Sequence, residues 1–279
     1  MSSIYAAFAT SASIDVRQVE SLLTDLAESI RAKESVPAEA IEGLTEYYGG
    51  QITSLDYFLH HFAPFVVHVA ERLIDQWRAD HRPSDPAAPT LLDLGCGTGV
   101  QAYLMAARGA KVIGVDRNET RMRAAKSMRN WFEDRFEKAL DVEFMDGDAF
   151  ETLASMPAEM FDSAYTQFAI AYMSPQDEML RRIDRVLKPG GRLAMQEFNS
   201  ACLYNRLISK VKWFSYRDFH RVAATLNWTC EYQRFRWFVP RPLIGLPGVR
   251  PIVGPLEEAV CRLPGSSLYA ASVSLVYRK

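Results

Sequence analysis

Residues 91–99 read Leu-Leu-Asp-Leu-Gly-Cys-Gly-Thr-Gly, which predicts a strand, a glycine-rich turn and the start of a helix. Glycines let a ligand approach the backbone closely, and the amide groups at a helix start attract polar groups. The next predicted strand, Lys111–Val115, leads directly into Asp116. A carboxylate there lies beside the glycine turn and can accept hydrogen bonds from both hydroxyls of a ribose. We therefore expect a nucleoside-binding site at this turn.

One acidic residue inside the motif narrows the choice of nucleoside. Asp93 lies two residues before the first glycine, Gly95. A carboxylate at that place repels a pyrophosphate but suits a cationic amine. In addition, Val100 stands where a dinucleotide-binding Gly-x-Gly-x-x-Gly motif has its third glycine. These residues favour S-adenosylmethionine, which carries an amine and a sulfonium and no phosphate, over NAD or NADP.

Five motifs in order make the sequence resemble the class I S-adenosylmethionine-dependent methyltransferases. The family's first motif matches residues 91–99 and its second matches Asp116. The third resembles 146–149 (Asp-Gly-Asp-Ala), the fourth resembles 161–168 and the fifth resembles 185–193. The resemblance covers about residues 90–200 and does not reach residues 1–80. It implies an α/β fold, a Rossmann-like three-layer sandwich around a mainly parallel, seven-stranded sheet.

The resemblance implies roles for residues on the methionine side of the cofactor. Asp93 would reach the amino group, and Gln167, after the fourth strand, would line the same side. Tyr48, with Tyr47 at a glycine-containing break between predicted helices, would fold over the cofactor as a lid. Four residues would form the loop beneath the methionine part: Gly95, Cys96, Gly97 and Gly99.

On the nucleoside side, the resemblance places Asp116 at the ribose, with Arg117 beside it. Asp148 and the backbone of Ala149 would bracket the adenine, and Asp146 is an alternative to Asp148 for that contact. Carboxylates in such loops also cap nearby amides. Asp116 and Asp148 are therefore open to a structural interpretation as well.

Methyl transfer needs a base only where the acceptor must lose a proton. Tyr172, after the fourth predicted strand, and His61, on a predicted N-terminal helix, are the candidate catalytic residues. His60 is adjacent to His61 and points in a different direction. Packing explains each of these side chains as well. No group of residues has the spacing of a metal site, so none is expected.

The chain divides into three regions. Apolar residues at helical spacing in 16–31 and 56–77, and Pro37 at a helix start, predict a helical N-terminal cap over residues 1–80. Three prolines within 81–89 predict a linker. From residue 90 strands alternate with helices, which predicts βαβ units and a catalytic domain over 90–279. Strands at 229–239 and 268–277 are expected to complete the sheet, one of them antiparallel.

Composition excludes several classes of protein. Of the 279 residues, 48% are apolar and 24% are charged, which is typical of a soluble globular protein. No apolar run approaches the ~20 residues of a membrane-spanning helix. Four widely spaced cysteines without a Cys-x-x-Cys pair argue against a disulfide framework or a zinc site, and favour a reducing cytoplasm.

Charge is distributed unevenly along the chain. The overall net charge is −2, yet residues 192–279 hold 13 Lys and Arg against 5 Asp and Glu. Scattered solvated arginines explain this excess, and so does a surface facing an anionic substrate or an anionic membrane. The basic residues form no run, so nucleic-acid binding is not expected.

Together these features predict methyl transfer from S-adenosylmethionine to a small molecule, apolar or anionic, with S-adenosylhomocysteine as the second product. Oxygen is the favoured acceptor atom, and the reaction is an in-line displacement in which the protein mainly aligns the reactants. The alternatives are a non-enzymatic scaffold of the same fold, use of the cofactor for other chemistry, and an NAD(P)-dependent oxidoreductase. The sequence leaves the oligomeric state open, including a homo-oligomer.

Overall fold

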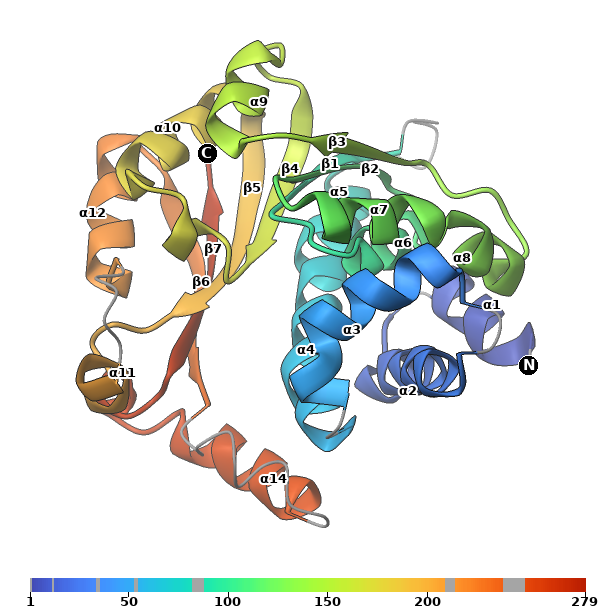
Figure 1. Cartoon of the computed structure of the whole chain (residues 1–279). Helices are drawn as coiled ribbons and strands as arrows, with labels where there is room; N and C mark the ends of the chain where they lie inside the picture. Colours follow the sequence, from blue (N-terminus) through green and yellow to red (C-terminus); the bar gives the residue numbers. More distant parts are fainter. Residues whose placement is uncertain are drawn as a thin grey trace. The chain divides into compact units, whose positions relative to one another are not determined.

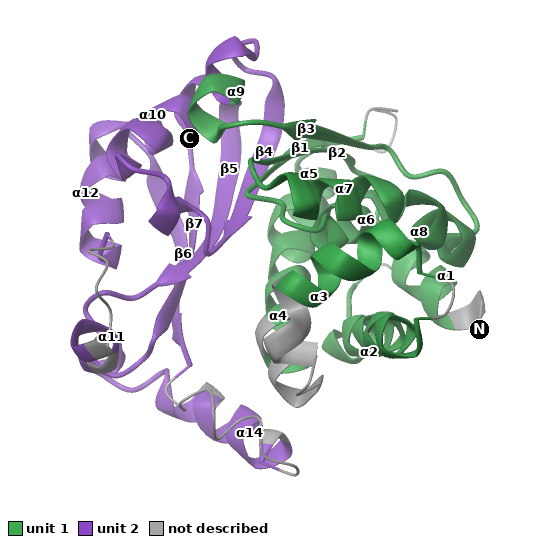
Figure 2. Ribbon diagram, in the orientation of Figure 1, with its two compact units in different colours: residues 1–152 green, residues 153–279 purple. Residues whose placement is uncertain are grey.

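The computed structural model describes residues 2–11, 13–33, 36–52, 55–81, 88–208, 214–237 and 249–279. The chain forms two compact units, residues 1–152 and 153–279 (Figure 2). Seven strands form one sheet in the order β3-β2-β1-β4-β5-β7-β6 (Figure 1). Strand β7 runs antiparallel to β5 and β6, whereas the other described pairs are parallel. The predicted mainly parallel, seven-stranded sheet is confirmed.

The first unit contains the N-terminal helices and three parallel strands. Its elements are α1 (Ser2–Thr10), α2 (Val16–Ala32), α3 (Ala38–Ile52), α4 (Leu55–Val69), the π-helical η1 (Ala70–Asp75), α5 (Gln76–Asp80), β1 (Thr90–Leu94), α6 (Val100–Ala107), β2 (Lys111–Asp116), α7 (Glu119–Ser127), α8 (Arg129–Phe136), β3 (Val142–Asp146) and α9 (Ala149–Ser155), the last ending just beyond the unit.

The second unit contains the remaining strands. Its elements are β4 (Phe161–Gln167), the 3-10 helix η2 (Ile170–Tyr172), α10 (Gln176–Val186), β5 (Leu187–Phe198), α11 (Leu203–Ile208), α12 (Tyr216–Thr225), β6 (Thr229–Arg236), α14 (Arg250–Val260), the 3-10 helix η3 (Ser266–Leu268) and β7 (Ser272–Arg278). Among the described residues, the helices are too short or too polar for any of them to cross a bilayer.

Parallel strands bring the candidate site residues of the first unit to one edge. Strand β1 is buried almost throughout, as expected for a strand covered on both faces. In the sheet register Asp93 of β1 pairs with Gly114 of β2, and Asp116 at the end of β2 pairs with Asp146 at the end of β3. The carboxyl ends of β2 and β3 therefore present their acids side by side.

Two helical segments differ from what the sequence indicates. Between the strands at 111–115 and 141–145 the sequence predicts one long helix over 119–139, whereas the structure divides it at Met128 into α7 and α8. The expected break at residues 47–50 is absent, because α3 continues through both glycines to Ile52. Helix α3 lies against α7 so closely that a Cβ at Gly43 would stand 2.6 Å from Cβ of Ala124. Such tertiary packing outweighs the poor helix propensity of glycine, which is worth about 1 kcal/mol per residue.

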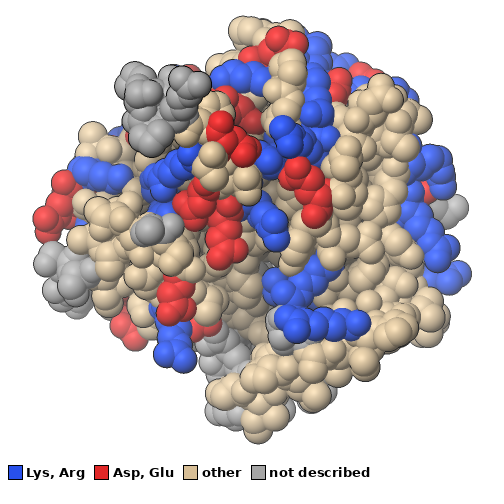
Figure 3. Space-filling model, turned by 180° about the vertical axis from the view of Figure 1, so that it is seen from behind, with Lys and Arg blue, Asp and Glu red and all other residues tan. Residues whose placement is uncertain are grey.

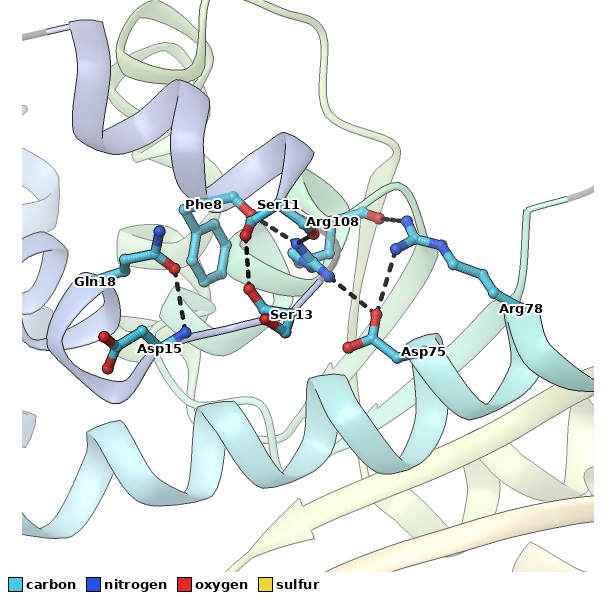
Figure 4. A network of polar contacts seen from close by, with 8 residues as sticks. All are labelled: Phe8, Ser11, Ser13, Asp15, Gln18, Asp75, Arg78 and Arg108. Atoms are coloured by element: carbon cyan, nitrogen blue, oxygen red, sulfur yellow. Dashed lines mark hydrogen bonds and ion pairs between the residues drawn. The ribbon is translucent and has the colours of Figure 1, made fainter.

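A buried arginine holds the N-terminal segment in place (Figure 4). Arg108, at the end of α6, is 1% exposed. Its guanidinium donates to the carbonyl oxygens of Phe8 (2.9 Å) and Ser11 (2.6 Å), and to the carboxylate of Asp75 (2.9 Å). Arg78 donates in turn to the carbonyl of Arg108. One side chain thus joins α1, the π-helical turn η1 and α6.

A buried glutamate holds the turn that follows β4. Glu197, in β5, is 1% exposed, and its carboxylate accepts the backbone N–H of Ile170 at 2.9 Å. Burial raises the pKa of Glu197 to about 8, although the nearby amides of Ile170, Ala171 and Ala169 act in the opposite direction. This turn carries Tyr172, so Glu197 fixes the backbone that presents a candidate catalytic residue.

Removal of the Arg108 side-chain charge should destabilise the protein strongly. The substitution Arg108→Met removes the buried hydrogen bonds to the carbonyls of Phe8 and Ser11 and leaves Asp75 with Arg78, at 3.3 Å, as its ion-pair partner. We therefore expect it to lower the free energy of unfolding by about 3 kcal/mol. Urea denaturation measures this value. Arg123→Ala, on the exposed face of α7, is the control and should change it by less than about 0.5 kcal/mol. Equal effects of the two substitutions on the free energy of unfolding would contradict the role of Arg108 in holding the N-terminal segment.

Glu197 should make stability depend on pH. Because its pKa is raised on folding, the folded protein holds this proton more tightly than the unfolded chain. Its contribution is complete below the unfolded pKa, near 4.5, and is lost as the pH rises through about 8. Glu197→Gln cannot ionise and should lose less stability than the wild type over this range, measured by urea denaturation at several pH values. Glu151→Gln, at an exposed position, should keep the wild-type slope, and parallel curves for all three proteins would refute the interpretation.

Candidate functional site

The glycine turn between β1 and α6 is fixed by the end of β2. The amides of Gly95 and Cys96 both donate to the carbonyl of Val115, at 2.8 and 3.1 Å. Gly95, Gly97 and Gly99 have φ values of 76°, 55° and 73°, a region that favours glycine. The predicted loop therefore adopts a conformation that needs its glycines.

Asp116 closes the turn from the side. One of its carboxylate oxygens accepts the amide of Gly97 at 2.9 Å, and the other accepts the amide of Asn118 at 2.9 Å. Asn118 itself caps α7 by accepting the amide of Arg121 at 2.9 Å. Each carboxylate oxygen keeps a second lone pair, so Asp116 can hold the loop and accept hydroxyl groups at once. The adjacent Arg117 is exposed.

The third acidic motif lies at the end of β3. Asp146 forms an ion pair with Lys126 of α7, and both side chains are about half exposed. Asp148 caps α9 by accepting the amide of Phe150 at 2.8 Å. Ala149, the first residue of that helix, is 8% exposed. The two aspartates thus have different partners. Gly147, between them, donates its amide to the carbonyl of Asp116 at 3.1 Å, which joins this motif to the end of β2.

Asp93 and Thr98 of the loop are buried, and Cys96 is half-buried. Asp93 is only 2% exposed, beneath the glycine turn. Burial and the carboxylates of Asp93 and Asp116 raise the pKa of the Cys96 thiol well above its ordinary range. The Cys96 sulfur lies 3.7 Å from the sulfur of Met122. The thiol is therefore a packed, protonated group, and Cys96 offers a ligand only its backbone.

Phe144 is a packing residue of the candidate site that sequence reasoning missed. A Cβ at Gly99 would stand 2.5 Å from its ring, and one at Gly114 would stand 2.8 Å from it. Gly99 and Gly114 thus make room for an aromatic ring under the loop. An apolar residue in the strand before the Asp-Gly-Asp-Ala motif gave no signal of this role, because the contact joins three separate segments.

Two predicted residues lie in the second unit, at the carboxyl end of β4. Gln167 donates from its amide nitrogen to the side-chain oxygen of Gln196 at 2.8 Å. Tyr172 is 60% exposed at the end of η2. Phe168, between them, packs with its ring centroid 4.6 Å from that of Phe198 and 4.9 Å from that of Trp237. An aromatic cluster therefore adjoins the turn that carries Tyr172.

The N-terminal candidates are only partly described. The side chains of Tyr47, Tyr48 and His61 lie outside the described residues. His60, on α4, is 9% exposed and so is a buried histidine. The close packing of α3 on α7 nevertheless places the N-terminal helices beside the segment that follows Asp116. Within the residues that the structure covers, no cluster of His, Cys, Asp and Glu has a metal-holding arrangement.

The acids at this edge give the candidate site its chemical character. Asp93, Asp116 and Asp148 are carboxylates around a turn whose backbone allows close approach. Carboxylates accept hydrogen bonds from hydroxyl and amino groups and disfavour phosphate. The geometry suits a nucleoside that carries positive charge.

Comparison with known proteins identifies the family of this chain. Residues 87–233 match a family described as "Methyltransferase domain". The 2-phytyl-1,4-naphtoquinone methyltransferase of Synechococcus elongatus is 30% identical over 201 residues, which cover 70% of this chain and 78% of that protein. Cypemycin N-terminal methyltransferase from a Streptomyces species is 36% identical over 118 residues, 41% of this chain and 43% of that protein. Ubiquinone biosynthesis O-methyltransferase of Pseudomonas entomophila is 31% identical over 113 residues, 40% of this chain and 46% of that protein.

Two of these three matches are partial, because the aligned part of this chain spans less than half the length of the relative. Among solved structures, the 4+2 cyclase SpnF has a TM-score of 0.54 at 22% identity, covering 77% of this chain and 80% of that one. That likeness concerns the fold. The family match, the longer relative and the sheet order agree with the predicted resemblance, and the chain belongs to the S-adenosylmethionine-dependent methyltransferases.

Proposed function

We propose that this protein transfers a methyl group from S-adenosylmethionine to a small-molecule acceptor. The observation that carries the proposal is the glycine turn docked on the end of β2, with Asp116 bonded to it through the amide of Gly97. Family membership supplies the reaction class, and the turn supplies a site of matching chemistry.

The residues present fit the cofactor. Three glycines at positive φ leave the loop backbone without side chains, so a ligand can lie against it. Asp93 would face the amino group of the methionine part, Asp116 the ribose hydroxyls, and Asp148 with the backbone of Ala149 the adenine. The role of Cys96 would be limited to its backbone, because its thiol packs against Met122.

When bound, the cofactor supplies an electrophilic methyl group on a sulfonium. The chain's own part is alignment: its loop amides and carboxylates hold one reactant, and the acceptor pocket holds the other in line. Such positioning is worth roughly 7–11 kcal/mol of the barrier. Gln167 would line the methionine side, with its amide oriented by Gln196.

We further propose that oxygen is the acceptor atom. An alcohol or phenol must lose its proton, which can leave to water, and Tyr172, exposed on a turn fixed by Glu197, is the candidate to hydrogen-bond the acceptor hydroxyl and orient it. The O-methyltransferase relative supports this atom, whereas the N-terminal methyltransferase relative supports nitrogen. His61 and Tyr48 are proposed to act from the N-terminal helices, His61 at the acceptor and Tyr48 over the cofactor.

Loss of the Asp116 carboxylate should weaken cofactor binding. Hydrogen bonds to a charged group contribute about 1.5–3 kcal/mol each, so Asp116→Ala should weaken S-adenosylhomocysteine binding about 100-fold, measured by calorimetry. Asp134→Ala, on an exposed part of α8, should bind like the wild type. Circular dichroism confirms that both variants fold. Wild-type affinity in a folded Asp116→Ala protein, or binding of NAD in place of S-adenosylhomocysteine, would contradict the proposal.

Product analysis distinguishes methyl transfer from other uses of the cofactor. This test is needed because a fold does not determine a reaction, and one fold neighbour is named as a cyclase. With phenolic, alcoholic and amine acceptors, mass spectrometry should show one methylated product per S-adenosylhomocysteine formed. The phenolic or alcoholic acceptors should be preferred. A product that forms equally well with S-adenosylhomocysteine in place of S-adenosylmethionine would refute methyl transfer.

A further inference from the structure

An exposed apolar stripe on α14 has no role in the reaction described above. Ile252 and Leu256, one helical turn apart, are 71% and 51% exposed. Leu263, which continues the same stripe just after the helix, is 55% exposed. The adjacent face of α14 is buried, with Val253 at 7% and Glu257 at 8%. The helix therefore packs on the unit with one face and presents a row of large aliphatic side chains on another.

Helix α11 adds a second exposed apolar group. Leu203 is 59% exposed and Leu207, one turn later, is 86% exposed. Leu268, in η3, is 54% exposed. Most of the large exposed hydrophobic residues in the described part of the chain thus belong to α11, η3 or the α14 region. Aliphatic side chains that gather on one part of a surface mark a site of association.

Two buried asparagines hold these segments together. Asn199, fully buried after β5, donates to the carbonyl oxygens of Ser267 (2.7 Å) and Ala270 (2.8 Å). Asn205 of α11 donates to the carbonyls of Asn199 (2.9 Å) and Ala271 (2.7 Å). The start of α11 and the segment between α14 and β7 are therefore fixed to each other. We call the exposed apolar residues of α11, η3 and the α14 region the leucine face: Leu203, Leu207, Ile252, Leu256, Leu263 and Leu268.

The sequence segments that carry the leucine face are rich in basic residues. Residues 199–214 contain three basic residues and no acidic one, and residues 234–268 contain five basic and two acidic residues. One of those acids, Glu257, is buried. Arg206, between Leu203 and Leu207, and Arg262, beside Leu263, are exposed. In Figure 3 the lower part of the molecule, where α14 lies, is mainly tan with Lys and Arg side chains beside it.

Helix length and charge together indicate the partner. At 11 residues α14 is about 16 Å long, far short of a membrane span. A short helix with an aliphatic face and flanking arginines is suited to lie in the headgroup region of an anionic bilayer. We infer that the leucine face docks this protein on the surface of a membrane that contains anionic lipids.

This docking would also orient the second unit. The last residue of β5, Phe198, pairs with Ser272 at the start of β7, so the leucine face lies at the carboxyl edge of β5. The turn after β4, with Tyr172, is bonded to the same end of β5 through Glu197. A bilayer under the leucine face would therefore lie toward the edge that carries the acceptor-side candidates, where a lipid-soluble acceptor could be collected.

Vesicle co-sedimentation of the full-length protein tests the inference. The wild type should sediment with vesicles of phosphatidylcholine and phosphatidylglycerol at low salt, and much less with phosphatidylcholine alone or at high salt. Leu207→Ser combined with Ile252→Ser should lower the partition coefficient at least about tenfold. Val16→Ser, at an exposed position on α2, is the matched control and should bind like the wild type.

Two further measurements keep the outcomes separate. Binding of S-adenosylhomocysteine by the double variant shows that the variant is folded. This assay contains no vesicles, so its result separates membrane docking from the proposed methyl transfer. Size-exclusion chromatography shows whether the double substitution changes the oligomeric state. The inference is overturned if the wild type does not bind anionic vesicles at low salt, if the double variant binds as well as Val16→Ser, or if the substitutions convert an oligomer to a monomer without changing vesicle binding.

Discussion

The carbonyl oxygen of Val115 accepts two amides of the glycine turn, and the arrangement of the candidate site depends on this contact. It joins the end of β2 to the residues that follow β1, so two strands that are neighbours in the sheet also share their loops. Asp116, the next residue, then lies where its carboxylate meets the amide of Gly97. The same acid holds the amide of Asn118, which caps α7. Loop shape, acid position and helix start are thus one hydrogen-bonded assembly.

In this assembly a structural role and a ligand-binding role of Asp116 do not exclude each other. A carboxylate oxygen has two lone pairs, and each oxygen of Asp116 spends one on a backbone amide. The remaining lone pairs are held in fixed directions before any ligand arrives. Preorganisation of this kind lowers the entropic cost of binding, so the capping contacts strengthen the case for a ligand contact at the same residue.

The sequence predicted the parts of the structure that depend on local chemistry. Strands β1 and β2, the glycine turn and the acids after the strands follow from short motifs, and the mainly parallel character of the sheet follows from the alternation of strands and helices. What could not be predicted are contacts between distant segments. Arg108 reads as an ordinary arginine at a helix end, and only the fold brings it to Phe8 and Asp75. Glu197 likewise gives no sign in the sequence that it is buried against the turn after β4.

Helix α3 shows that contacts between distant segments can also override a local sequence signal. Two consecutive glycines after two tyrosines are a reasonable signal for a break, yet the helix continues through them. An earlier glycine provides the reason. Gly43 lets α3 approach α7 to a distance that any larger residue would prevent, since a Cβ there would also stand 2.9 Å from the carbonyl oxygen of Thr120. The packing that this glycine permits stabilises the helix. Helix propensity counts every glycine as destabilising and does not include such tertiary contacts.

The second unit places two irregular segments at one sheet edge, and its asparagines show how such an edge is made stable. The chain leaves β5 and enters β7 at adjacent positions, so two irregular segments meet there with backbone carbonyls that need donors. Asn199 and Asn205 together supply four hydrogen bonds to those carbonyls from buried positions. With the backbone carbonyls satisfied by these asparagines, the exposed aliphatic side chains of α11 and α14 are not needed to hold the edge. Their aliphatic residues are therefore available to face outward.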